Sequence, residues 1–91
     1  MLAVRFSRHF ERKLVAFRRK HPELAGRLGR VLRDLDEDPY RPRLRLHALS
    51  GAYAGQHAVS VTNEYRIRLL IIIRDNEIEL LDIGTHDEVY R

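Results

Sequence analysis

The chain has 91 residues, of which 44% are hydrophobic, and this length predicts one compact domain over residues 1–91 with a single small core. It contains no cysteine, which excludes disulfides, thiolate metal sites and a cysteine nucleophile. No apolar run approaches the length of a membrane span, and residues 1–5 lack the apolar stretch of a secretory signal, so a soluble cytoplasmic protein is expected.

Positive charge is concentrated in the first half of the chain. Residues 1–45 carry 13 Lys or Arg against 6 Asp or Glu, whereas residues 46–91 carry 4 against 7. This asymmetry favours a polyanionic partner, nucleic acid or an acidic protein, but two solvated Arg-rich helices would give the same composition. Only Lys13 and Lys20 are lysines, and the planar fork of arginine is well suited to hold phosphate.

Two helices are predicted after a short first strand at residues 2–6. Ser7 is suited to cap a helix over residues 7–20, whose apolar stripe consists of Phe10, Leu14 and Phe17. The pair His21-Pro22 ends this helix, because the residue before proline disfavours helical geometry. A second stripe predicts a second helix that ends before Asp38-Pro39; its residues are Leu24, Leu28, Val31, Leu32 and Leu35.

Beyond a proline-containing linker at residues 40–43, the apolar period changes from helical to two. A strand is expected to begin at Leu44, followed by a loop at residues 50–55 and three strands at about 56–61, 65–74 and 77–84. Asp75-Asn76 is read as a tight two-residue turn between the last two strands. The order predicts an α+β domain, with two N-terminal helices on one face of a mainly antiparallel, four- to five-stranded twisted sheet.

Alternation along the strand at residues 65–74 assigns its odd-numbered residues, Tyr65 to Ile73, to the face under the helices. Arg66 and Arg68 then point to the opposite face. A three-residue loop at 62–64 pairs Ser60 with Arg66, and counting through the Asp75-Asn76 turn brings Thr85 across from Arg66. The same count sets Asp82 opposite Leu69 on the core face, which requires a bulge or a partner there.

Residues 84–91 place a histidine and a tyrosine where the sheet ends. Histidine titrates near neutral pH and can move protons, and tyrosine offers an aromatic face and a hydroxyl, so both suit work on a nucleotide. A polar turn that only closes the domain is the alternative.

Several segments share one pattern: Leu46-His47-Ala48-Leu49-Ser50-Gly51, Tyr53-Ala54-Gly55, Tyr65-Arg66-Ile67 and the nine residues 82–90. Together they resemble the RelE/ParE superfamily of type II toxin-antitoxin toxins, and within it the RelE-like and YafQ-like ribosome-dependent mRNA endoribonucleases. The resemblance covers essentially the whole chain. It implies a compact sheet with two N-terminal helices, no metal or cofactor, and cleavage of mRNA in the ribosomal A site through attack of the ribose 2′-OH on the next phosphate.

The resemblance implies a catalytic role for Arg66 and His86. Arg66 matches the strand arginine of the family and would clamp the scissile phosphate; the alternative is a surface ion pair with Glu64 or Glu79. His86 matches the near-terminal histidine of YafQ-like members and would act as general acid or base; the alternative is a turn-capping histidine bonded to Asp87.

Tyr90 and His47 complete the implied catalytic set. Tyr90 matches the terminal aromatic residue, which would stack on a base or orient the phosphate, unless it only packs on the sheet. His47 matches another histidine of the YafQ-like pattern, although a lone histidine beside a strand often satisfies local hydrogen bonds. RNA contacts are expected from Arg43, Arg45, Ser60, Arg68 and Thr85.

The chain also departs from the family pattern. Ser60 and Glu64 stand where YafQ-like members carry further acid-base groups, and the sheet lysines of RelE have no lysine counterpart, so the catalytic set is partial. His57 points toward the core by parity and is not counted in the site.

The implied partners are a cognate acidic antitoxin, the ribosome and mRNA, with the free toxin a monomer and the toxin–antitoxin complex a heteromer. Two other functions stay open, a ParE-like toxin that acts on DNA gyrase and a non-catalytic relic that only binds an antitoxin. The combination of an acid-base His86 with a phosphate-binding Arg66 favours the endoribonuclease.

Overall fold

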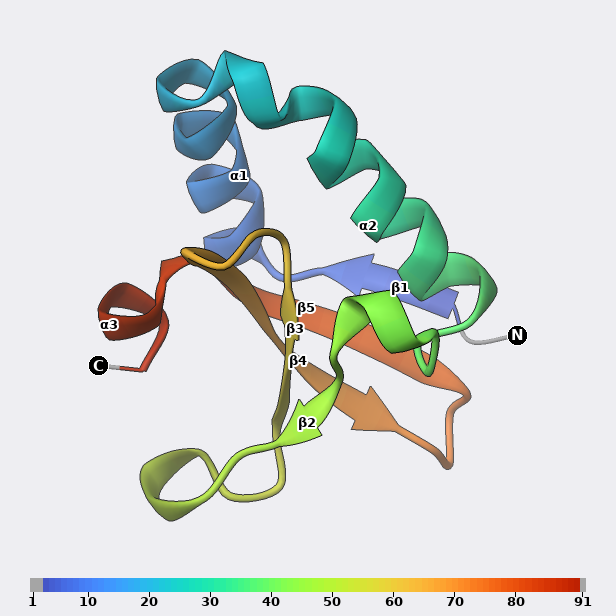
Figure 1. Ribbon diagram of the computed structural model, residues 1–91. Coiled ribbons are helices and arrows are strands. Elements are labelled where there is room, and N and C mark those ends of the chain that lie inside the picture. Colours follow the sequence, from blue (N-terminus) through green and yellow to red (C-terminus); the bar gives the residue numbers. More distant parts are fainter. Residues whose placement is uncertain (1–2, 91) are drawn as a thin grey trace.

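The computed structural model describes residues 3–90, and its strands form one five-stranded mixed sheet in the order β1-β5-β4-β3-β2 (Figure 1). β1 runs parallel to β5, and every other neighbouring pair is antiparallel. The strands are β1 (Ala3–Phe6), β2 (His47–Ala48), β3 (His57–Ser60), β4 (Tyr65–Ile72) and β5 (Glu77–Thr85). The predicted α+β class and its mainly antiparallel sheet are confirmed; Leu2, the expected first residue of β1, lies outside the described residues.

Helices α1 (Arg8–Lys20) and α2 (Ala25–Glu37) lie on one face of this sheet, as predicted (Figure 1). Ser7 caps α1, since its Oγ accepts a hydrogen bond of 3.0 Å from the Phe10 N–H. A 3₁₀ turn at Pro22–Leu24 separates the helices, and both apolar stripes enter the core. The most deeply buried stripe residues are Phe10, Leu28 and Leu35. No helix among residues 3–90 is long and apolar enough to span a membrane.

The register between β3 and β4 follows the prediction, with Val59 opposite Ile67 and Ser60 opposite Arg66. The register between β4 and β5 does not. Ile71 pairs with Ile78 and Ile72 with Glu77, so residues 73–76 form the connection in place of a two-residue turn. Ile73 therefore lies outside the core, with 83% of its surface exposed.

A β-bulge adds a further shift in register, and Arg66 pairs with Gly84 rather than with the expected Thr85. The pairing shifts between Arg68 and Leu69, where Leu81 is the extra residue of β5, so that Asp82 pairs with Arg68 and Leu80 with Leu69. The sequence predicted either a bulge or a partner at Asp82, and the structure has both. The buried Asp82 carboxylate lies 3.2 Å from His9 Nε2 and accepts the Ile83 N–H at 2.9 Å.

Two segments differ in kind from the prediction. Leu44 belongs to a 3₁₀ turn at Pro42–Leu44 instead of opening a strand, and β2 begins only at His47, after Arg45 in the left-handed conformation with φ +53°. Residues 86–89 form a third, short helix, α3 (His86–Val89), in place of an irregular end. The Thr85 hydroxyl accepts the Glu88 N–H and the Glu88 carboxylate accepts the Thr85 N–H, which starts this helix.

Candidate active site

A pocket of about 520 Å³ opens on the sheet face away from α1 and α2. Its walls come from β2 and the loop that follows it, from the start of β4 and from α3. All four residues predicted as catalytic line it: His47, Arg66, His86 and Tyr90. The structure thus brings together side chains that are separated by up to 43 positions in the sequence.

Arg66 is held on β4 and forms no ion pair with another side chain of residues 3–90. Its side chain is half-buried and its Nε is fully enclosed, yet this nitrogen has no hydrogen-bond partner among residues 3–90. The expected alternative, an ion pair with Glu64 or Glu79, does not form, and Glu79 instead accepts from Arg5 at 3.2 Å. A buried donor left unpaired costs about 1–3 kcal/mol, so this arrangement favours a guanidinium that binds an external anion.

His86, the first residue of α3, and Tyr90, which directly follows its last residue, lie side by side. Their ring centroids are 4.5 Å apart with the rings at 78°, an edge-to-face contact that orients both side chains at the pocket. The hydroxyl of Tyr90 is buried and has no hydrogen-bond partner within the described chain. His86 Nδ1 lies 3.6 Å from the Asp87 carboxylate, the contact expected if His86 has only a structural role, while the cap of α3 is Thr85.

His47 lines the same pocket from β2. Its Nδ1 lies 2.9 Å from the Arg45 carbonyl oxygen, which can only accept, so the ring donates from Nδ1. The opposite nitrogen, Nε2, is then left with a lone pair in the neutral ring. His47 therefore forms the local hydrogen bond that was expected as its alternative role, and it also lines the pocket.

Arg43, one of the expected RNA contacts, lies elsewhere. It and Arg41 bind the buried carboxylate of Asp34 on α2: Arg43 donates from Nε and Nη2 at 2.7 and 2.6 Å, and Arg41 from Nη1 at 2.7 Å. The hydrogen bond from Arg43 lowers the pKa of Asp34 to about 2, although burial acts in the opposite direction. We name this group, Asp34 with Arg41 and Arg43, the Asp34 clamp.

The other expected RNA contacts are divided. Ser60 pairs with Arg66 in the sheet but lines a different pocket beside Arg27 and Arg30 of α2. Thr85 is engaged in the α3 cap. Arg45 is exposed next to His47. Of the five residues expected to contact RNA, it is the one that keeps an exposed charge beside the pocket.

Arg68 is also bound within the chain. It donates from Nε to the Val89 carbonyl at 3.0 Å and from Nη1 to Gln56 Oε1 at 2.6 Å. Its guanidinium lies 4.4 Å from the centroid of the Tyr53 ring. Tyr53 also lines the pocket, although the sequence pattern did not predict it as a site residue. The flanking Gly51 and Gly55, both with positive φ, are the sequence signal for a shaped loop that presents it.

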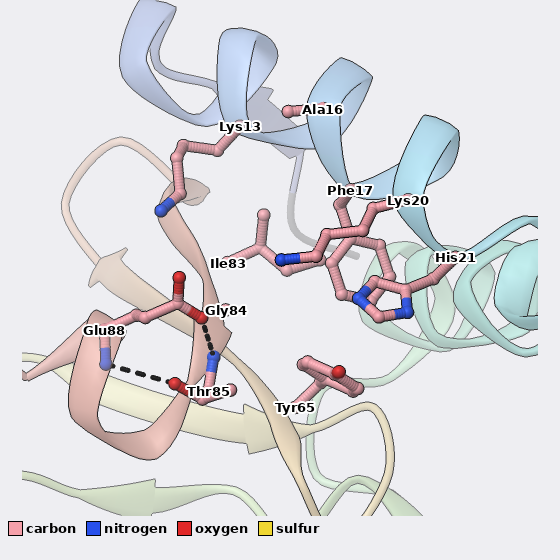
Figure 2. A pocket seen from close by; sticks show the side chains of 10 residues that line it. All are labelled: Lys13, Ala16, Phe17, Lys20, His21, Tyr65, Ile83, Gly84, Thr85 and Glu88. Carbon is pink, nitrogen blue, oxygen red and sulfur yellow. Dashed lines mark hydrogen bonds between the residues drawn. The ribbon is translucent and has the colours of Figure 1, made fainter.

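A second, smaller pocket of about 210 Å³ lies between α1 and α3. Figure 2 shows Lys13 and Lys20, the two lysines of the chain, extending from α1 toward this space, with Glu88 on the opposite wall. The hydrogen bond from the Thr85 N–H holds the pKa of Glu88 below its usual range. Within residues 3–90, no three His, Asp or Glu side chains are grouped so as to hold a metal ion.

No protein-family model and no curated protein matches the sequence, but solved structures match the fold. YafQ from E. coli superposes with a TM-score of 0.82 at 14% identity over 100% of both chains. A metal-bound toxin from Helicobacter pylori gives 0.81 at 23% identity, covering 99% of this chain and 100% of that one. A YoeB/ParE toxin from Agrobacterium tumefaciens gives 0.77 at 14%, covering 93% and 99%.

YafQ within the E. coli DinJ-YafQ toxin-antitoxin complex also superposes, with a TM-score of 0.79 at 15% identity over 99% of this chain and 98% of that one. The fold and the pocket thus define an α+β protein with a polar site at the outer face of its sheet. More particularly, the chain has the fold of YafQ and of the YoeB/ParE toxin, which confirms at the level of fold the resemblance to the RelE/ParE superfamily.

Proposed function

We propose that this chain is the toxin of a type II toxin-antitoxin system and acts as a metal-independent endoribonuclease on ribosome-bound mRNA. The observation that carries the proposal is the unpaired, enclosed Nε of Arg66 in a pocket shared with two histidines and the unpaired Tyr90 hydroxyl. Fold similarity to YafQ, which occurs in a toxin-antitoxin complex, supports the same assignment.

The reaction needs a phosphate clamp and two proton transfers. Arg66 binds the scissile phosphate and stabilises the charge that it gains when the ribose 2′-oxygen attacks phosphorus. One group removes the 2′-OH proton, and another gives a proton to the 5′-oxygen as the P–O5′ bond breaks. The products are a 2′,3′-cyclic phosphate and a 5′-hydroxyl, and no water or metal takes part in this step.

His86 and His47 are the proposed proton-transfer groups. They approach the pocket from different elements, α3 and β2, so that an RNA strand bound at Arg66 lies between them. Nε2 of His47 carries the lone pair that a base requires, because its Nδ1 is engaged with Arg45. Tyr90 donates its hydroxyl to a phosphate oxygen or stacks on a base.

The ribosome supplies part of the positioning in this proposal. Ser60 and Thr85, which were expected near the phosphate, contribute no free group to the pocket, so the acid-base set of the protein is sparse. Holding the reacting 2′-oxygen in line with the phosphate is worth several kcal/mol of the barrier, and the ribosome-bound codon provides that order.

Expression of the chain without a partner tests the proposal. We expect growth arrest and in-frame cuts in translated mRNA, mapped by the 5′-hydroxyl ends, while the same RNA free in solution is cut poorly. Arg66→Ala, expressed to the same level, is the matched control and should leave mRNA intact. DNA damage without mRNA cuts would instead indicate a gyrase-directed toxin, and neither effect would leave an antitoxin-binding protein without toxicity.

The partner is proposed to be a cognate antitoxin with an acidic, partly disordered segment that folds onto this domain. Exposed arginines on α1 and α2 provide most of the positive surface: Arg8, Arg12, Arg18, Arg19, Arg27, Arg30 and Arg33. The pocket between α1 and α3 adds Lys13 and Lys20 (Figure 2). Glu88 lines the same pocket and Lys13 Nζ lies 3.7 Å from the Asp82 carboxylate, so the exposed arginines carry the excess of positive charge that fits an acidic partner.

A further inference from the structure

Tyr53 lies in the pocket without a role in the proposed proton transfers. It ends the 3₁₀ turn Gly51–Tyr53 in the loop between β2 and β3, and its half-buried ring shares the pocket with Arg66 and His86. The ring is not part of the hydrophobic core. A loop aromatic residue that faces a polar pocket offers a flat surface for stacking.

One face of the Tyr53 ring is fixed by Arg68. The Arg68 guanidinium lies 4.4 Å from the ring centroid, a cation–π contact, and only 15% of the Arg68 side chain is exposed. Hydrogen bonds to Gln56 and to the Val89 carbonyl prevent the guanidinium from swinging toward solvent. Arg68 is therefore a support behind Tyr53 rather than the RNA contact expected from its place on the strand.

The backbone that carries Tyr53 is equally constrained. The Tyr53 N–H donates to the Ser50 carbonyl at 3.3 Å, and the Tyr53 carbonyl accepts from the Gln56 N–H at 3.0 Å. The Leu49 N–H donates to the Gln56 carbonyl at 2.9 Å and closes the loop. A ring held in this way loses little conformational freedom when a ligand stacks on it, which favours binding.

The geometry points to Tyr53 as a stacking platform for a nucleobase of single-stranded RNA, next to the phosphate at Arg66, with Arg68 as the positioning residue behind it. This inference rests on the proposed function and adds a base subsite to it. Tyr90 bounds the subsite, since its ring centroid lies 6.2 Å from that of Tyr53 at an angle of 51°. A flat base stacks on Tyr53 and meets Tyr90 at its edge, independent of base identity.

Binding of a trinucleotide to the full chain tests the platform. The trinucleotide carries hydrogen in place of every 2′-hydroxyl, so that it cannot be cleaved. Three further trinucleotides of the same kind each lack one of the three bases. In the wild-type chain, loss of one particular base should weaken binding about 5- to 100-fold, as measured by NMR titration. Tyr53→Leu should weaken the intact trinucleotide by the same factor and remove its sensitivity to that base, whereas Tyr53→Phe should bind normally.

Tyr40→Leu is the matched control, because it makes the same change at a tyrosine that is 66% exposed and does not line the pocket. Nuclear Overhauser contacts between base protons and the Tyr53 ring in the wild-type chain provide a readout that needs no variant. Their absence, or equal sensitivity of wild type and Tyr53→Leu to every base removal, overturns the platform. Arg66→Ala separates this result from failure of the proposed function: if it binds the trinucleotide as tightly as wild type, or if wild type does not bind at all, the RNA site itself is wrong.

Discussion

At the residue scale, the proposed chemistry depends most on His86. Its side chain is exposed, packs edge-to-face against Tyr90 and is not part of the core, so changing it should leave the core intact. Glutamine keeps hydrogen-bonding capacity but does not exchange a proton near neutral pH. We expect His86→Gln to reduce cleavage of ribosome-bound mRNA by about 10²- to 10⁴-fold while antitoxin affinity persists. A fully active His86→Gln chain would favour the gyrase-directed or non-catalytic function.

Tyr90 separates stacking from hydrogen bonding. Its hydroxyl is buried without a partner in the described chain, and its ring contacts both His86 and Tyr53. Tyr90→Phe keeps the ring and removes the hydroxyl, so we expect an intermediate cleavage rate, above that of His86→Gln and below wild type. Cleavage equal to wild type would show that Tyr90 acts through its ring alone.

Arg66 and Leu69, three positions apart on β4, test the assignment of the two sheet faces. Arg66 points away from the helices, whereas Leu69 is fully buried in the core. Arg66→Ala should abolish cleavage with little change in unfolding free energy, and Leu69→Ala should lower that free energy by about 2–5 kcal/mol through a cavity. Urea unfolding measures both, and equal destabilisation would contradict the face assignment.

At the scale of elements, the Asp34 clamp joins the end of α2 to the segment that leads into β2 and His47. Because the folded-state pKa of Asp34, about 2, lies below its ordinary 3.8, the stabilisation is present above pH 3.8 and is lost as the pH falls toward 2. The difference corresponds to about 2 kcal/mol. Asp34→Asn should therefore be less stable than wild type at about pH 7, and the gap should narrow at about pH 3.

Asp36→Asn is the matched control for this measurement, since Asp36 is on the same helix and exposed. Urea unfolding of the three chains at both pH values gives the comparison. A gap between wild type and Asp34→Asn that does not depend on pH would show that the clamp contributes through shape and packing rather than through the charge of Asp34.

At the scale of the whole molecule, charge separation governs the proposed partner. The exposed arginines lie on α1 and α2, which cover the sheet face opposite the Arg66 pocket. Arg41 and Arg43 are instead paired with Asp34. Binding of the acidic antitoxin should weaken as salt rises from low to high ionic strength, measured by calorimetry. Affinity independent of salt would show that apolar contacts, not the basic helices, hold the partner.

Much of the site could be predicted because alternation along a strand determines which side chains share a face. Arg66 and its pairing with Ser60 follow from that rule, and His86 follows from its position after the last strand. Thr85 was placed opposite Arg66 by the same counting, but the four-residue connection and the bulge pair Arg66 with Gly84. Ser60 pairs with Arg66 as expected, yet it does not line the pocket. Counting along strands gives the right neighbours only when the length of each connection and the position of each bulge are known.

The sequence by itself determined the two amphipathic helices, the α+β order of elements and the face on which Arg66 lies, because burial of apolar surface enforces helical and strand periods locally. Only the tertiary structure decided the bulge at Leu81, the capture of Arg43 by Asp34 and the support of Tyr53 by Arg68. Each of these contacts joins groups that are far apart in the sequence, and each group has several possible partners. Which partner a group binds depends on distances that exist only in the folded chain.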